Sequence, residues 1–130
     1  MLPIQVIPGI FVGTGDMFSA LTLARLRDEA ELAGLLDTTS WISPDNVQST
    51  ELPLAKALES VLGSMRGVLE KTRVVRDKKL ASLSLGKDTK MDNVRIMKAS
   101  ELQLVKGQKD LMYPENDYKA LPLDVSEVVN

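Results

Sequence analysis

An apolar segment that runs directly into two closely spaced glycines is the feature that most constrains this chain. Residues 4–12 are mostly apolar, Gly13-Thr14-Gly15-Asp16 follows, and a helix-like pattern begins at once. The first N–H groups of a helix have no partner within the helix, and the helix dipole places partial positive charge there. Glycine lets the backbone adopt positive φ and approach a ligand closely. This order of residues predicts a buried strand, a tight turn and a helix N-terminus that can bind a phosphate.

Asp16 needs a separate explanation, because a carboxylate directed at a phosphate repels it. As an N-cap, Asp16 would accept a hydrogen bond from a following backbone N–H group and stabilise the helix by about 1 kcal/mol. As a general base, it would take a proton from a substrate hydroxyl group while the glycine backbone holds a transferring phosphoryl group. The segment is not a Walker loop, since no Lys-Ser or Lys-Thr pair follows the glycines. Both interpretations of Asp16 stay open at this point.

The composition excludes several kinds of chemistry. The 130 residues contain no Cys and no His, which excludes disulfides, thiolate and imidazole metal sites, and histidine bases. A glycine-bound phosphate with one Asp base is compatible with the groups that remain. The net charge of −2 gives no reason to expect binding to nucleic acid or to an anionic membrane. The sequence shows no signal-peptide pattern and no apolar run of membrane-spanning length, so we expect a cytoplasmic protein.

Hydrophobic periodicity predicts two long helices joined by a polar loop. The first extends over residues 17–36, its charged side chains form a solvated face, and Gly34 offers an earlier end. The loop covers residues 37–50. Pro53 begins the second helix, and we expect its apolar face to pack against a sheet. The apolar positions of this second helix are Leu54, Leu58, Val61, Leu62, Met65, Val68, Leu69, Thr72 and Val75.

Two further features lie on the second helix. Gly63 and Gly67 each lower its helix propensity by about 1 kcal/mol relative to alanine, and they would let another helix or a nucleotide come close. A basic stretch follows them, and it could bind phosphate. Because Glu70 and Asp77 are interleaved with it, a solvated helix end is the preferred interpretation. The basic residues are Arg66, Lys71, Arg73, Arg76, Lys78 and Lys79.

The C-terminal third carries weaker signals. Residues 81–99 lack clear periodicity, so we expect a flexible insert. Leu102, Leu104 and Tyr118 are expected in a short strand and a return to the core. Residues 124–130 have the composition of a loose tail.

The residues around the glycines closely resemble a signature near the C-terminal end of pyridoxal kinases, which belong to the ribokinase-like superfamily. Gly-Thr-Gly-Asp is common to the superfamily, whereas the flanking residues, Phe11-Val12 and Met17-Phe18-Ser19-Ala20, resemble the pyridoxal kinase branch. The resemblance covers residues 4–80 and 100–120. Further similar segments are Leu54-Ala55-Lys56-Ala57, Val68-Leu69-Glu70-Lys71-Thr72, Glu101-Leu102-Gln103-Leu104-Val105 and Lys109-Asp110-Leu111, while Trp41 and Ser43-Pro44-Asp45 resemble a fungal-type member.

The resemblance implies roles for the matching residues. Gly13 and Thr14 match residues that contact ATP phosphates, and with Gly15 they would form an anion hole through their backbone N–H groups. Asp16 matches the catalytic base, which binds the substrate and deprotonates the 5′-hydroxymethyl group of pyridoxal or pyridoxine. Leu69 matches an apolar wall beside the adenine, and it is equally explained as a helix core position. The implied cofactor is ATP with Mg²⁺, whose ligands would lie mostly outside this chain.

The resemblance also implies a fold. Residues 1–130 would form the C-terminal segment of one pyridoxal kinase domain, an α/β/α sandwich of ribokinase-like (Rossmann-like) type that is predominantly helical in this portion. The vitamin-binding residues and most ATP-binding strands would lie upstream, so we expect Met1 to begin a fragment or a truncated gene model that is inactive alone. Without the sheet, its apolar helix faces would be exposed, so we expect a partly ordered, helix-rich species. The full-length protein would be a homodimer, as family members commonly are.

Three functions remain open from the sequence. The first is ATP-dependent phosphorylation of a small-molecule B6 vitamer (pyridoxal, pyridoxine or pyridoxamine) in vitamin B6 salvage. The second is another ribokinase-like kinase, acting on a hydroxymethylpyrimidine or a sugar. The third is a non-enzymatic helical protein that binds a partner through exposed apolar faces, and this function would survive Asp16→Asn.

Overall fold

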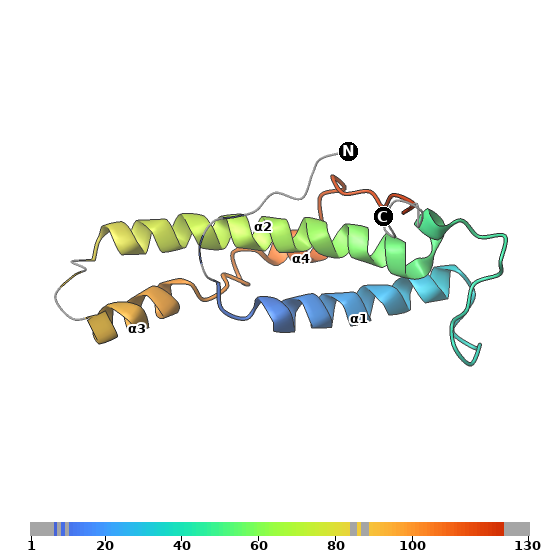
Figure 1. Cartoon of the computed structure of the whole chain (residues 1–130), viewed down its shortest axis with the longest axis horizontal. Coiled ribbons are helices and arrows are strands. Elements are labelled where there is room, and N and C mark those ends of the chain that lie inside the picture. The colour runs from blue at the N-terminus through green and yellow to red at the C-terminus, as the bar shows by residue number, and fades with distance from the viewer. Residues whose placement is uncertain (1–6, 8, 10, 84–85, 87–88, 124–130) are drawn as a thin grey trace, which may run out of the picture.

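The described part of the molecule is a set of helices arranged around one long helix. A computed structural model describes residues 7, 9, 11–83, 86 and 89–123. In Figure 1, α2 extends along the molecule, α1 lies along one half of it, α3 lies near the other half, and α4 lies beside its middle. The elements are α1 (Thr14–Leu32), the short 3₁₀ helix η1 (Ser49–Glu51), α2 (Pro53–Ala81), α3 (Thr89–Ala99) and α4 (Gln108–Met112).

The described residues contain one isolated parallel bridge, between Val12 and Glu101, in place of the predicted strands. Most of the predicted first strand, residues 4–12, lies outside the described residues. The C-terminal strand prediction is wrong, because irregular residues 102–103 follow the bridge and the backbone then turns at residues 104–107 into α4. Leu102, Leu104 and Tyr118 therefore lie in irregular segments, and the α/β part of the expected fold rests on the family resemblance.

Helix α1 ends just before Gly34, which was the earlier of its two predicted ends. Gly34 has φ of +70°, the left-handed conformation that commonly ends helices. The Gly34 N–H donates to Glu31 O at 3.0 Å, and the Leu35 N–H donates to Ala30 O at 2.8 Å. This pair of bonds is a Schellman motif, so the predicted continuation to residue 36 is wrong.

Helix α3 corrects the second part of the predicted flexible insert over residues 81–99, because residues 89–99 are helical. Its C-terminal end packs near α2, where Ala99 is buried together with Ser100. The Ser100 N–H donates to Ile96 O at 3.0 Å, which continues the helical hydrogen-bond pattern past the last residue of α3. The signal was weak because Lys, Asp, Asn and Arg interrupt the apolar positions of this segment. The predicted tail, residues 124–130, lies outside the described residues.

Helix α2 starts at Pro53 as predicted, but its buried positions only partly match the predicted apolar face. Val61, Val68 and Thr72 are buried, while Leu54 is 49% exposed. Charged Arg76 is buried too, so the predicted solvated helix end is wrong at this position. The reason is that α2 packs against α1, α3 and α4 rather than against a sheet.

Gly63 and Gly67 lie where the C-terminal segment (residues 101–123) packs directly on α2. A Cβ atom at Gly63 would collide with the backbone oxygen of Glu115, and one at Gly67 would collide with the carboxylate of Asp110. The Lys71 ammonium group pairs with the same Asp110 carboxylate. Of the two predicted roles for these glycines, the close approach of another helix is confirmed at Gly67, where α4 lies, whereas an irregular segment lies over Gly63.

Arg25 connects α1 to both α2 and α4. Its Nη2 donates to Ser64 Oγ and to Leu111 O, each at 2.6 Å, and the Ser64 hydroxyl in turn donates to Asp110 O. Burial lowers the pKa of the Arg25 guanidinium. The sequence prediction placed this residue on a solvated face, and it is wrong because the partners of Arg25 come from distant parts of the chain.

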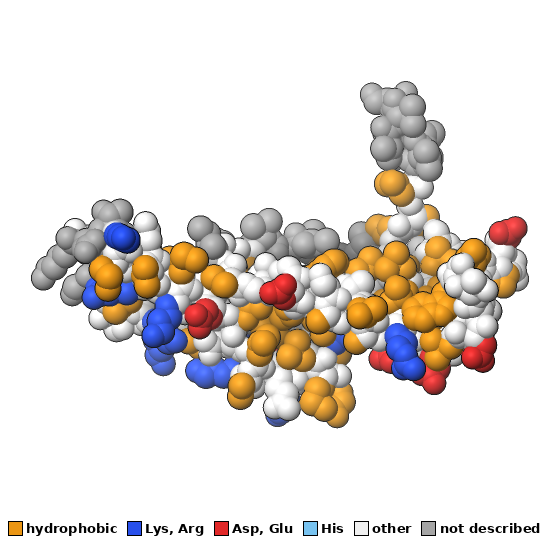
Figure 2. Space-filling model, turned by 90° about the horizontal axis from the view of Figure 1, so that it is seen from below, with side chains coloured by type: hydrophobic (Ala, Val, Ile, Leu, Met, Phe, Trp, Pro, Cys, Tyr) orange, Lys and Arg blue, Asp and Glu red, His pale blue; other side chains and the backbone are white. Residues whose placement is uncertain are grey.

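Apolar side chains are exposed along the surface formed by α1 and α3. Leu23 is 70% exposed and Leu32 is 81% exposed on α1, and Met97 is 58% exposed on α3. Figure 2 shows hydrophobic side chains spread along this side of the molecule. Such exposure agrees with the expectation that the helix faces lack a covering layer. Within the described ranges, no helix is both long and apolar enough to cross a membrane.

Gly63→Ala should destabilise the chain more than Gly67→Ala. At Gly63 the new methyl group meets a backbone oxygen, and overpacking that the neighbours cannot relieve costs about 1–3 kcal/mol. At Gly67 it meets a side chain that can rotate, and the gain in helix propensity of about 1 kcal/mol offsets part of the cost. Urea unfolding followed by circular dichroism measures both variants. Two variants as stable as the unsubstituted chain would contradict the packing of residues 110–115 on α2.

Candidate functional site

The Gly13–Asp16 segment forms the N-terminal turn of α1. Gly13 is the N-cap residue with φ of +92°, a conformation that favours glycine. The first bond of the helix runs from the Met17 N–H to Gly13 O at 3.1 Å. The N–H groups of Thr14, Gly15 and Asp16 therefore have no acceptor within the helix. The predicted helix N-terminus after the glycine turn is confirmed, and it begins three residues earlier than predicted.

Gly15 leaves open space beside this turn. A Cβ atom at Gly15 would have no heavy atom within 4 Å, whereas a Cβ atom at Gly13 would contact Leu102 Cδ1 at 3.6 Å. Thr14 is half-buried between them. An anion thus has room next to N–H groups at the positive end of the helix dipole. The residues present fit a phosphate group.

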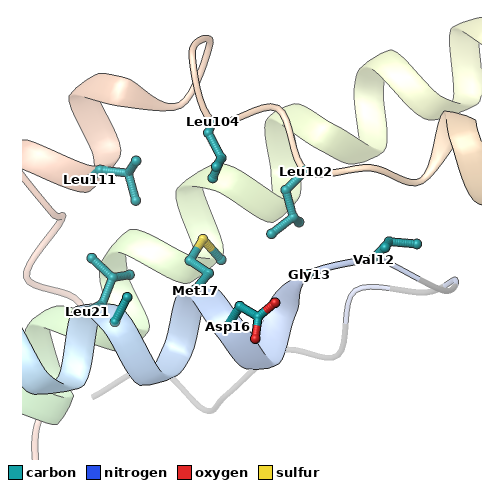
Figure 3. A pocket seen from close by; sticks show the side chains of 9 residues that line it. Val12, Gly13, Asp16, Met17, Leu21, Leu102, Leu104 and Leu111 are labelled. Carbon is teal, nitrogen blue, oxygen red and sulfur yellow. The ribbon is translucent and has the colours of Figure 1, made fainter.

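Asp16 occupies the third position of α1 and is exposed. The N-cap prediction for Asp16 is wrong, because Gly13 takes that position without any side-chain cap hydrogen bond. Figure 3 shows the Asp16 carboxylate on the first turn, near the Gly13 end of a pocket. A carboxylate in the first turn is stabilised by the helix dipole, and an exposed one can exchange a proton with a bound molecule.

The pocket beside Asp16 has a volume of about 510 Å³. Asp16 is the charged residue of its lining, and the other side chains are apolar. In Figure 3 the leucines of the C-terminal segment lie across from Met17 and Leu21 of α1. The site is therefore an apolar hollow with a carboxylate and a helix N-terminus at one end, a shape that suits a small organic molecule. Its lining residues are Val12, Gly13, Asp16, Met17, Ala20, Leu21, Leu102, Leu104 and Leu111.

The far wall of this pocket was missed by sequence reasoning. Leu102 and Leu104 were predicted in a strand, and no relation of these residues or of Leu111 to Asp16 was predicted. Leu111 lies in α4, and its backbone oxygen is the acceptor for Arg25. The three leucines reach the pocket because the C-terminal segment returns onto α2, which no local pattern indicates.

Leu69 is not brought together with the glycine motif. It lies on α2, is half-buried, and is not among the residues that line the pocket beside Asp16. Its half-buried position agrees with the core interpretation, and its role beside an adenine stays a prediction. The described ranges hold no group of three or more Asp and Glu side chains placed to bind a metal ion. We assign no metal ligand to these residues.

The chain is similar to a protein of Schizosaccharomyces pombe that is named as a putative pyridoxal kinase. The two sequences are 34% identical over 116 residues, which is 86% of this chain. The matched part is 31% of the relative, so the chain spans about a third of that protein. No protein-family model and no solved structure matches the chain. The similarity supports a pyridoxal kinase-like relationship over most of the chain.

Gly13→Ala should disrupt the start of α1, whereas Gly15→Ala should not. Alanine at Gly13 must adopt the left-handed conformation, which costs about 1–2 kcal/mol. Gly15 already has a helical backbone and open space, so alanine there gains helix propensity. Thermal unfolding followed by circular dichroism compares the two variants. Equal melting temperatures would contradict the left-handed N-cap at Gly13.

Proposed function

We propose that this chain carries the phosphoryl-transfer site of a pyridoxal kinase and acts together with the part of such a protein that the present chain does not span. The supporting observation is the position of Asp16, an exposed carboxylate on the first turn of α1 beside open N–H groups and an apolar pocket. The similarity to the S. pombe relative supports the kinase class.

In this proposal the helix N-terminus binds the transferring phosphoryl group. The N–H groups of Gly13, Thr14 and Gly15 form the anion hole and stabilise the negative charge that develops on the phosphoryl oxygens. The open space beside Gly15 supports this role, because a ligand can approach the backbone there without displacing a side chain. ATP supplies the phosphoryl group, and Leu69 is proposed to contact its adenine.

Asp16 acts as the general base. It accepts the proton of the substrate 5′-hydroxymethyl group while a bond forms between the hydroxyl oxygen and the γ-phosphorus, and ADP leaves as its bond to that phosphorus breaks. The apolar walls beside Asp16, which include Met17 and Leu102, limit the access of water to one side of the carboxylate. Exclusion of water favours transfer to the substrate over hydrolysis.

The remaining parts of the proposal rest on the family resemblance. They are a B6 vitamer as substrate, Mg²⁺ held mostly by residues outside this chain, a ribokinase-like fold, a fungal-type member of the family, and a homodimeric full-length protein. The proposed cytoplasmic location rests on the sequence patterns described above. A partner-binding role is the second candidate, and the exposed apolar side chains of α1 and α3 favour it.

Asp16→Asn should strongly lower turnover in a chimera in which this chain replaces the matching third of the S. pombe relative. Asparagine keeps the shape of the side chain but cannot take the proton, so turnover should fall by about 10²–10⁴-fold. The measurement is phosphorylation of pyridoxal, pyridoxine and pyridoxamine with Mg-ATP. The matched control is Asp28→Asn, which changes an exposed carboxylate of the same helix and should keep full turnover.

Two results would contradict the proposal. Undiminished turnover of the Asp16→Asn chimera would exclude Asp16 as the base. If the chimera is folded but transfers no phosphoryl group in an assay in which the S. pombe protein is active, the kinase function is excluded and partner binding is favoured.

A further inference from the structure

Arg76 lies against the chain that leads into the glycine motif. It is only 8% exposed, although Lys78 and Lys79 of the same basic stretch are exposed. Its Cζ atom lies 4.8 Å from the centroid of the Phe11 ring, within the range of a cation–π contact. Gly9 passes over the same guanidinium group so closely that a Cβ atom there would collide with it. Arg76 therefore contacts this segment both at a side chain and at the backbone.

The geometry of Arg76 suits a fixed contact. Its Nε and Nη2 donate to Asp77 Oδ1 at 3.1 and 3.0 Å, so a carboxylate accompanies the buried cation. A guanidinium is planar and keeps one orientation when it is bound along an edge, which leaves its face for an aromatic ring. The Asp77 bonds thus orient the group whose face lies over Phe11.

This contact is close to the functional site along the chain. Phe11 is followed by Val12, whose N–H donates to Ser100 O at 3.0 Å, and then by Gly13, the N-cap of α1. Arg76 contacts the side chain of Phe11, and Ser100 binds the backbone N–H of Val12, the residue directly before Gly13. Because the direction of the chain into a helix sets the direction of its first N–H groups, these two contacts determine how the N-terminus of α1 is presented.

We propose that Arg76 is a positioning residue for the site at the N-terminus of α1. It does not touch Asp16, and it acts through Phe11 and Gly9 on the segment that carries Gly13. The contact of Arg76 with Phe11 and Gly9 is observed in the structure, whereas its effect on catalysis rests on the proposed kinase function. Loss of the contact should displace the anion hole, and a displacement of about 1 Å can lower turnover by about 10²-fold.

Fluorine NMR tests the contact directly on this chain. The sequence contains two phenylalanines, Phe11 and Phe18, so labelling with 4-fluorophenylalanine gives two resonances, and Phe18→Leu assigns them. Arg76→Gln should move the Phe11 resonance towards its position in urea and leave the Phe18 resonance unchanged. Arg76→Lys should retain part of the Phe11 shift, because an ammonium group can also lie over the ring. The control Lys79→Gln removes a positive charge one turn further along and should move neither resonance.

The kinetic test uses the chimera with the S. pombe relative. Arg76→Gln should lower kcat at least tenfold with KM within twofold, and Arg76→Lys should recover part of the loss. Phe11→Leu removes the ring and keeps the cation, so it should lower kcat by a similar factor. The double variant Phe11→Leu/Arg76→Gln should lose no more than either single variant, because both remove one contact.

Each failure has a distinct meaning. An unchanged Phe11 resonance in Arg76→Gln overturns the contact, and the Phe18 resonance reports whether that variant is folded. A moved Phe11 resonance with unchanged kcat overturns the positioning role and leaves the kinase proposal intact. Additive losses in the double variant also overturn it, since separate effects on stability add. An inactive unsubstituted chimera contradicts the kinase function and not the contact.

Discussion

Close contact at three glycines determines how this chain is arranged. Gly63 and Gly67 let residues 110–115 lie directly on α2, and at Gly107 a Cβ atom would come within 2.8 Å of Val68 Cγ2. Side chains at these points would push the C-terminal segment away from α2. Because the segment lies there, the backbone of Leu111 can accept the Arg25 hydrogen bond that joins α1 to α2 and α4. The pocket beside Asp16 is a consequence of the same packing, since its far wall belongs to this segment.

The elements with local start and stop signals could be predicted from the sequence. Pro53 begins α2, Gly34 ends α1, and Gly13 directly precedes α1. The predicted C-terminal strand was not found in the described ranges, because a strand depends on partner strands that a local pattern does not contain. Helix α3 was missed because polar residues interrupt its apolar positions, so no periodic pattern indicates a helix. It packs against α2 through its C-terminal end.

The candidate site was predictable where it depends on backbone geometry and not where it depends on distant contacts. Gly13 adopts the positive φ that its position indicates, and the helix begins directly after it. The half-buried position of Arg25 and the burial of Arg76 were not predictable, because charge clusters on helices are usually solvated and the partners of these residues here lie far along the chain. The N-cap prediction for Asp16 failed because the helix begins earlier than predicted, so Gly13 occupies the N-cap position and Asp16 lies within the first turn.

The most direct test of the phosphate site is an NMR titration of the chain labelled with ¹⁵N-glycine. The chain has eight glycines, and the Gly13→Ala and Gly15→Ala variants identify the signals of the motif. On addition of tripolyphosphate we expect the amide signals of Gly13 and Gly15 to shift and saturate, while those of Gly63 and Gly67, packed under the C-terminal segment, stay in place. Unmoved signals of Gly13 and Gly15, or equal shifts at all glycines, would contradict an anion site at the N-terminus of α1.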